Sequence, residues 1–82
     1  MRECDMNKSR RNRLGNITSM LDTAISTLEE LREEEEESYD NLPESLQSSE
    51  KGENMEEAIS DLECAIDSLN EAVEYVNRAK DN

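Results

Sequence analysis

The sequence predicts an all-α protein: a long antiparallel helical hairpin, similar to a coiled coil, with a structured connection that contains the single proline. Two runs of apolar residues alternate between spacings of three and four, as in helices that pack along a seam. Phe and Trp are absent and only 33% of the 82 residues are hydrophobic, so one hairpin can bury little apolar area. We therefore expect two copies to associate into a homodimeric four-helix bundle.

The chain divides into a flexible basic tail, residues 1–8, and one helical domain, residues 9–82. The first helix is expected over about residues 9–38, and two helices of about 26 residues would each be roughly 40 Å long. In the first helix the main apolar residues are spaced 3, 4, 3, 4 and 3 apart, and Ile25 and Met20 widen this apolar stripe. The predicted packing seam of this helix consists of Leu14, Ile17, Leu21, Ala24, Ile25, Leu28 and Leu31.

The connection is expected over residues 39–53, after a run of five glutamates that forms an exposed end of the first helix. Pro43 suits the first position of a short helical turn, after which Leu42 and Leu46 lie on one face. With Tyr39 they are expected to fold back over the end of the hairpin. The same three side chains could instead be the apolar anchors of a contact with a partner.

The second helix is expected over about residues 54–80 and has the more regular pattern. Gly52 marks the break before it, and Asn54 with Glu57 three residues later has the pattern of a capping box. Beside the apolar seam runs a row with one alanine every seven residues, ending at Ala79, which would let a neighbouring helix approach closely. The predicted seam consists of Met55, Ala58, Ile59, Leu62, Ala65, Ile66, Leu69, Ala72, Val73 and Val76.

Charge is divided unequally along the chain, whose formal net charge is −13. Residues 1–13 carry five Lys and Arg against two acids, whereas residues 14–82 carry 20 Asp and Glu against four Lys and Arg. An acidic body repels the phosphates of nucleic acid. We therefore expect a protein partner with a basic surface, and no direct contact between the acidic body and nucleic acid.

No pattern indicates catalysis, so the sequence predicts a protein that is not an enzyme. Histidine is absent, so no serine or cysteine has the usual base that activates a nucleophile. Cys4 and Cys64 cannot complete a zinc site, and the glutamate run lacks the spacing and central glycine of a calcium-binding loop. We expect no metal, no cofactor and two free thiols in a reducing compartment.

The acidic residues allow two interpretations. They could form a solvated surface that keeps a Leu-rich hairpin soluble. Alternatively they could imitate nucleic acid, because 20 carboxylates over about 40 Å approach the duplex density of one charge per about 1.7 Å. The candidate interaction surface consists of Glu29, Glu30, Glu33, Glu34, Glu36, Glu37, Tyr39, Asp40, Leu42 and Leu46, followed on the second helix by Asp61, Glu63, Asp67, Glu71 and Glu74.

The basic segment, residues 8–13, also allows two interpretations. It could contact nucleic acid, but it has no aromatic residues for base stacking. It could instead pair with the acidic end of a neighbouring antiparallel subunit, which is the interpretation we favour. No stretch approaches the ~20 apolar residues of a membrane span, and the N-terminus lacks the apolar region of a signal peptide. The expected location is the cytoplasm, without a membrane partner.

Three stretches give the chain a resemblance to known proteins. They are the basic start Arg10-Arg11-Asn12-Arg13, the glutamate run that leads into residues 39–47, and the heptads of residues 56–72. Over most of residues 8–76 the chain resembles a group of small acidic helical-hairpin proteins encoded by bacteriophages and prophages. The connection Asp40-Asn41-Leu42-Pro43-Glu44 is the most specific part. Most members of the group have no assigned function, so the resemblance implies a bacterial host cell and little mechanism. Very small acidic phage proteins are often inhibitors of host machinery, including nucleases and other defence proteins.

The functional hypothesis is a non-catalytic protein that binds and blocks a basic, nucleic-acid-binding surface of a host or defence protein. The alternative is a homo-oligomeric structural or assembly protein whose acidic surface only keeps it soluble. A third is a small regulator whose basic N-terminus contacts nucleic acid, an activity that deletion of residues 1–13 would abolish. Salt dependence distinguishes the first two hypotheses, because charge screening weakens an electrostatic complex and does not weaken a coiled coil.

Overall fold

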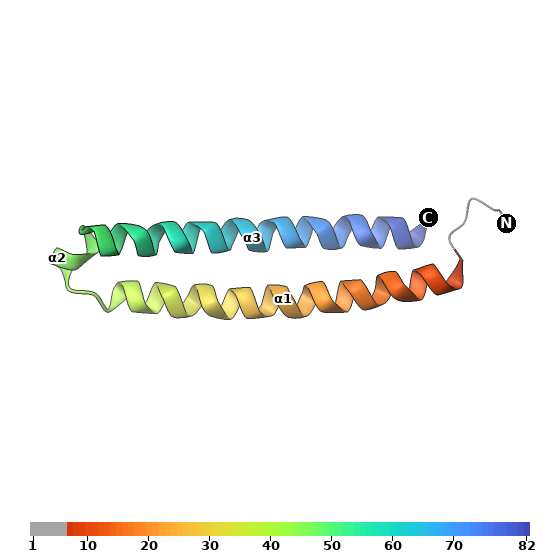
Figure 1. Cartoon of the computed structure of the whole chain (residues 1–82), viewed down its shortest axis with the longest axis horizontal. Helices are drawn as coiled ribbons and strands as arrows, with labels where there is room; N and C mark the ends of the chain where they lie inside the picture. The colour runs from red at the N-terminus through yellow and green to blue at the C-terminus, as the bar shows by residue number, and fades with distance from the viewer. Residues whose placement is uncertain (1–6) are drawn as a thin grey trace.

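Two long helices lie side by side and antiparallel in the computed structural model, which describes residues 7–82 (Figure 1). α1 spans Lys8–Asp40, α3 spans Glu50–Asp81, and the short α2, Glu44–Gln47, lies at the corner between them. The molecule measures 65 × 16 × 12 Å. The expected all-α architecture is confirmed, but α1 extends slightly beyond its predicted range of residues 9–38 and α3 begins before its predicted range of residues 54–80.

The N-terminus of α1 is closed by a side-chain cap. Asn7 is the N-cap residue, and its Oδ1 accepts a hydrogen bond from the backbone N–H of Arg10 at 2.9 Å. Lys8 is already helical, so the predicted tail over residues 1–8 is too long by at least that residue. The rest of the predicted tail, residues 1–6, lies outside the described residues.

The helices pack along one seam with alternating spacings of three and four. On α3 all the residues expected in the seam are buried or half-buried. On α1 the buried or half-buried positions are Arg11, Leu14, Gly15, Thr18, Leu21, Ala24, Ile25, Leu28, Arg32, Glu35 and Tyr39. Among the described apolar side chains, only Ile25 at 8% exposure and Ile66 at 5% are buried, so the core of a single hairpin is thin.

The α1 residues that face α3 differ in part from those predicted from the sequence. Ile17 and Leu31 were expected in the seam, but they are 42% and 45% exposed and lie at its edge. The row one residue further along, Thr18, Ile25 and Arg32, faces α3 instead. Thr18 tolerates this position because its hydroxyl donates a hydrogen bond to the Leu14 carbonyl at 3.1 Å. The phase thus buries Ile25 and leaves a second apolar row beside the seam.

The corner also differs from the prediction, because α3 begins at Glu50 and not near residue 54. Ser49 is the N-cap, and its Oγ accepts a hydrogen bond from the Gly52 N–H at 3.5 Å. Gly52 therefore lies in the first turn of α3 and does not mark a break. It is buried, and a Cβ at this position would lie 2.1 Å from the carbonyl oxygen of Gln47. The close approach of α2 to α3 therefore requires glycine.

Candidate functional site

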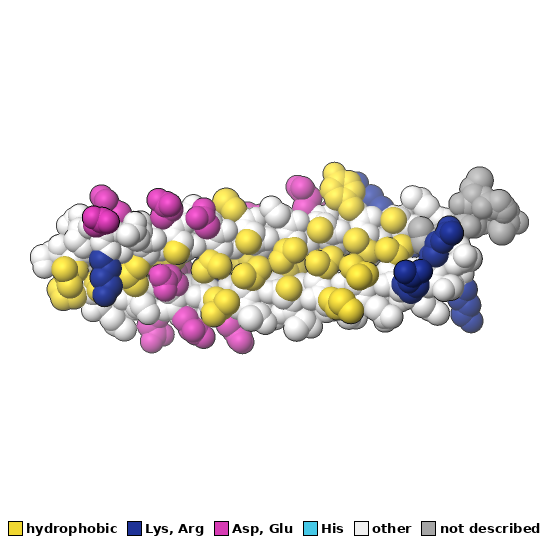
Figure 2. All heavy atoms as spheres, viewed as in Figure 1, with side chains coloured by type: hydrophobic (Ala, Val, Ile, Leu, Met, Phe, Trp, Pro, Cys, Tyr) yellow, Lys and Arg dark blue, Asp and Glu magenta, His cyan; other side chains and the backbone are white. Residues whose placement is uncertain are grey.

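The two sides of the hairpin that flank the seam differ in chemistry. We call one of them the apolar side. Its residues are Ile17, Met20, Ala24 and Leu31 of α1 and Ala58, Ala65, Ala72 and Ala79 of α3. Figure 2 looks onto a face on which hydrophobic side chains form a band along the line between the two helices. Leu31 and Ala58 line one shallow hollow with Leu62, which places both rows on the same side of the seam.

The opposite side, which we call the acidic side, contains a shallow hollow near the corner. The Tyr39 hollow is lined by Glu36, Tyr39 and Asp40 of α1 and by Glu56, Ile59, Ser60 and Glu63 of α3. Four carboxylates thus surround one phenol, and all four are exposed. The hollow has the groups that would receive a cationic side chain: negative charge at its rim and an aromatic ring within it.

Tyr39 is held in place by both its side chain and its backbone. Partial burial raises the pKa of the phenol above its usual 10.0, and the charge of Glu56, a hydrogen bond to Glu56 and the charge of Asp40 raise this pKa further. The Tyr39 carbonyl accepts hydrogen bonds from the Leu42 N–H at 3.0 Å and from Gln47 Nε2 at 3.2 Å. These bonds tie α2 to the end of α1 and fix the rim of the hollow.

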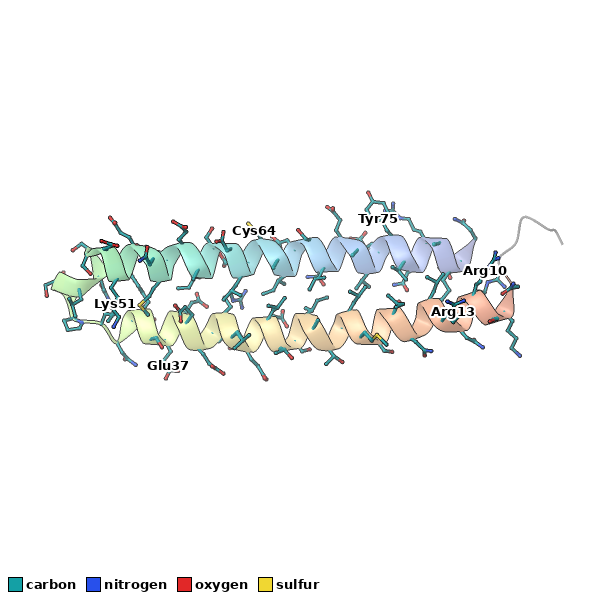
Figure 3. The ribbon with its side chains drawn as sticks, in the orientation of Figure 1. Arg10, Arg13, Glu37, Lys51, Cys64 and Tyr75 are labelled. Carbon is teal, nitrogen blue, oxygen red and sulfur yellow. The ribbon has the colours of Figure 1, made fainter. Side chains whose placement is uncertain are left out.

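Charge separates the molecule along its length into two halves. The loop half, residues 29–63, carries 15 Asp and Glu against two Lys and Arg. The open half, residues 7–28 and 64–82, carries five Asp and Glu against six Lys and Arg. In Figure 3, Arg10 and Arg13 lie at the open end of the hairpin, whereas Glu37 lies near the corner. The formal charges are −13 and +1, so almost all of the negative field comes from one half of the described molecule.

The two long helices differ in how their charges meet the helix dipole. α3 begins with Glu50 and Glu53 and ends with Arg78 and Lys80, the arrangement that a helix dipole favours. α1 has no acidic residue in its first turn and no basic residue in its last turn. It begins instead with basic residues and ends with the glutamate run. The charges of α1 therefore oppose its own dipole.

The structure brings some of the predicted surface residues together and separates others. Glu36, Tyr39, Asp40 and Glu63 meet at the Tyr39 hollow. Glu34 and Asp61 lie beside Leu31, on the edge of the apolar side. Glu29, Glu30, Glu33 and Glu37 are exposed on α1, and Leu42 is half-buried and Leu46 is 42% exposed at the corner. Asp67, Glu71 and Glu74 lie in the open half, where Glu74 forms an exposed ion pair with Arg78 at 3.8 Å.

Three polar residues of the loop half were missed by the sequence prediction. Glu56 lines the Tyr39 hollow, and Arg32 and Glu35 occupy the α1 seam. Arg32 Nε lies 3.5 Å from Glu36 Oε1 but is buried without a hydrogen-bond partner. Continuing the spacing from Leu28 by four and then three would have found both seam residues. Their charge concealed them, because an apolar Leu31 lies next to this row.

No group of three or more Cys, Asp and Glu within residues 7–82 is placed to hold a metal ion. Cys64 is an exposed free thiol, and Cys4 lies outside the described residues. None of the helices described here is both long enough and apolar enough to cross a membrane.

The chain matches no protein-family model, and neither a curated protein nor a solved structure is significantly similar to it. The resemblance to small phage and prophage proteins therefore stays a prediction. Fold and surface together define an all-α hairpin protein with one strongly acidic half and one apolar side.

Proposed function

We propose that this chain is a non-catalytic interaction protein whose loop half binds and blocks a basic surface on another protein. The observation that carries the proposal is the concentration of 15 carboxylates against two cations within residues 29–63. A field of one sign over one end of an elongated body attracts and orients a partner of opposite charge. Such basic surfaces are typical of nucleic-acid-binding proteins.

Charge density supports a surface that competes with nucleic acid. Over the full 65 Å of the molecule, 20 carboxylates give only about one per 3 Å, so the estimate of about one per 2 Å from the sequence is too high. The helices are longer than that estimate assumed. The α1 and α3 segments of the loop half, residues 29–40 and 50–63, are about 20 Å long by helix rise, so their 14 carboxylates give about one per 1.5 Å. That density is close to duplex DNA, at one charge per about 1.7 Å.

The opposed dipole of α1 supports a binding role for these charges. A carboxylate near a helix C-terminus lowers helix stability by about 0.3–1 kcal/mol, and like charges four residues apart add to this. The run at residues 33–37 meets both conditions. Charges that do not stabilise their own helix are more consistent with binding than with folding.

The Tyr39 hollow is the centre of the proposed contact. An arginine or lysine from the partner would lie against the phenol ring and pair with Glu36, Glu56 or Glu63 at the rim. A planar guanidinium fits this set better than an ammonium, because it can stack and pair with a carboxylate at the same time.

The resemblance to phage and prophage proteins supports a bacterial partner. A host nuclease or a defence protein with a basic nucleic-acid groove would meet the charge and size of the loop half. Blocking that groove would inhibit the partner without any chemistry in this chain. The site of action would then be the bacterial cytoplasm.

A second candidate function is homo-oligomeric assembly, in which the acidic surface serves only solubility. The apolar side favours this alternative, because Ile17, Met20 and Leu31 are between 42% and 64% exposed on a single hairpin. The two functions are compatible in one protein. They differ in what salt does, because screening weakens the contact with a basic partner and leaves apolar association intact.

The test is affinity capture from bacterial lysate with the tagged full chain, washed at low and at high salt, with bound proteins identified by mass spectrometry. The variant Glu33→Lys, Glu36→Lys, Glu37→Lys reverses three charges of the loop half. The matched control Asp67→Lys, Glu71→Lys, Glu74→Lys makes the same charge change in the open half. We expect one stoichiometric basic partner that salt releases, that the first variant loses and that the control keeps.

A purified partner then allows a direct competition experiment. Duplex DNA should displace the chain from the partner, since both would occupy the same basic surface. Recovery of only the chain itself at every salt concentration would contradict the proposal and leave assembly as the function. Equal loss of binding in both charge-reversal variants would also contradict it, because net charge alone would then account for the capture.

A further inference from the structure

We propose that the apolar side is a dimer interface and that the two copies lie antiparallel, related by a two-fold axis that passes α1 at Ala24. In this arrangement α1 faces α1 of the second copy and α3 faces α3 of the second copy. The inference specifies the surface and orientation of self-association. It does not depend on the proposed basic partner, because the acidic side stays uncovered.

Exposed apolar area marks this side as incomplete. Ile17 is 42%, Leu31 is 45% and Met20 is 64% exposed, whereas only Ile25 and Ile66 are buried among the described apolar residues. The face seen in Figure 2 measures 65 by 16 Å. That is large enough for the roughly 800 Å² that each partner contributes to an interface of standard size.

Apart from Met20, the residues of the apolar side are arranged symmetrically about one point on each helix. On α1, Ile17 and Leu31 each lie seven residues from Ala24. On α3 the outer pair Ala58 and Ala79 and the inner pair Ala65 and Ala72 share one midpoint, between residues 68 and 69. A two-fold axis through these points would place Ile17 on Leu31 of the second copy and pair each alanine with another alanine.

The α1 midpoint, Ala24, and the α3 midpoint, between residues 68 and 69, lie at the same position along the long axis of the hairpin. At the open end, Arg11 Nε donates a hydrogen bond to the Lys80 carbonyl at 3.1 Å. Near the corner, Tyr39 and Glu56 line the same hollow. Between these two anchors, helices of equal rise place Ala24 level with roughly residue 69. A single axis therefore serves both helices, which an arbitrary pattern of apolar residues would not provide.

Charge at the two ends of the apolar side decides the orientation. Arg10 and Arg13 flank the apolar hollow at Leu14 and Ile17. At the other end, Glu34 and Asp61 flank the hollow at Leu31. An antiparallel pair brings Arg13 of each copy beside Glu34 of the other. A parallel pair would instead bring together two loop halves of formal charge −13 each, and repulsion between these like charges disfavours that arrangement.

The arrangement has a consequence for the acidic side. Each copy turns its acidic side outward, so the dimer presents two Tyr39 hollows on opposite faces and near opposite ends. The alanine rows allow α3 and its copy to approach closely, since alanine adds little bulk between helices.

The first experiment measures the mass of the full chain in solution by light scattering and sedimentation. We expect twice 9.4 kDa for the natural sequence. The variant Ile17→Asp, Leu31→Asp should give 9.4 kDa, with its helical circular dichroism showing that the hairpin still folds. The matched control Ser19→Asp, Ser26→Asp adds the same charge at exposed positions of α1 away from the apolar side and should stay dimeric.

The second experiment tests the orientation by cysteine cross-linking, after Cys4→Ser and Cys64→Ser. Ala24→Cys should cross-link with itself through a short thiol reagent, because it lies at the axis. Leu31→Cys should not cross-link with itself, but should do so in a mixture with Ile17→Cys. A parallel dimer would place Ala24 opposite α3 of the second copy and give neither result.

A charge exchange completes the test. Arg13→Glu should weaken the dimer at low salt by about tenfold, and the added substitution Glu34→Arg should restore it. A natural chain that stays at 9.4 kDa at about 100 μM, or a dimer that Ile17→Asp, Leu31→Asp leaves intact, would overturn the proposal. Failure of Ala24→Cys to cross-link in a dimer would overturn the orientation. Capture of a basic partner by the monomeric variant would separate this result from the fate of the proposed function.

Discussion

The open half and the loop half of the hairpin use one heptad pattern in two ways. In the open half the seam is largely aliphatic on both helices, it contains both buried isoleucines, and the charges nearly cancel. In the loop half α1 places Arg32, Glu35 and Tyr39 in the seam, and 15 carboxylates cover the surface. Packing energy is thus concentrated where charge is low, and charge is concentrated where packing is weak. The contrast indicates that packing and surface charge are divided along the long axis, and the proposed binding surface lies in the half with the weaker packing.

The substitution with the largest expected effect removes apolar packing from the open half. Ile66 is the least exposed apolar residue, at 5%, so Ile66→Ala should lower the free energy of unfolding by about 3 kcal/mol. The control in the loop half is Leu46→Ala, which removes a side chain that is 42% exposed and should cost less than about 1 kcal/mol. Urea unfolding followed by circular dichroism measures both values. Equal losses would show that the loop half contributes as much packing as the open half.

Replacing a glycine by alanine in each half tests the same contrast. At Gly52 a Cβ would lie 2.1 Å from the Gln47 carbonyl oxygen, so Gly52→Ala should push α2 away from α3 and lower stability by about 2 kcal/mol. Gly15 in the open half has no atom within 4 Å of the same position. Gly15→Ala should therefore raise stability by up to about 1 kcal/mol, the difference in helix propensity. Thermal unfolding of the two variants should shift in opposite directions, and a shift in the same direction would contradict this account of the corner.

A third substitution should make the loop half more like the open half. Glu35 lies half-buried in the α1 seam and shares hollows with Met55 and with Leu62. Glu35→Leu should raise the free energy of unfolding by about 1 kcal/mol, because it adds apolar contact and removes one of the crowded carboxylates. Glu30→Leu at an exposed position removes the same charge without adding contact in the seam. Only a gain larger than that of this control would support the assignment of Glu35 to the seam.

The α3 seam could be predicted residue by residue, whereas the α1 seam could not. On α3 the row of large aliphatic residues follows the required spacing and is buried or half-buried throughout, and the row beside it holds only alanine. On α1 two rows lie one residue apart, and the row with more aliphatic residues leaves Ile17 and Leu31 exposed and Ala24 half-buried. Local periodicity cannot choose between two such rows, because the choice depends on which residues α3 presents.

The corner and the Tyr39 hollow were harder to predict for a related reason. Residues 48–57 contain several Ser, Asn and Glu, so more than one N-cap pattern is available, and the contact of Gly52 with α2 selects Ser49. The exposure of the glutamates could be predicted from their charge, except for Glu35, which the seam half-buries. Which of them meet depends on the seam phase, and that is why the meeting of Glu36 with Glu63 was not predicted and Glu56 was missed.

The smallest expected effect concerns the one titration that distinguishes the loop half. Burial, followed by the charge and hydrogen bond of Glu56, raises the pKa of Tyr39 above 10.0 in the folded protein. The folded state therefore holds the phenolic proton more tightly than the unfolded chain. The stabilisation is complete below the unfolded pKa near 10 and is lost as pH rises through the higher folded value. Tyr39→Phe keeps the ring and cannot ionise, so its thermal midpoint should fall less between about pH 9 and about pH 11 than that of the natural chain. Superimposable pH profiles would show that the phenol does not couple to folding, and the Tyr39 hollow would then be looser than its hydrogen bonds indicate.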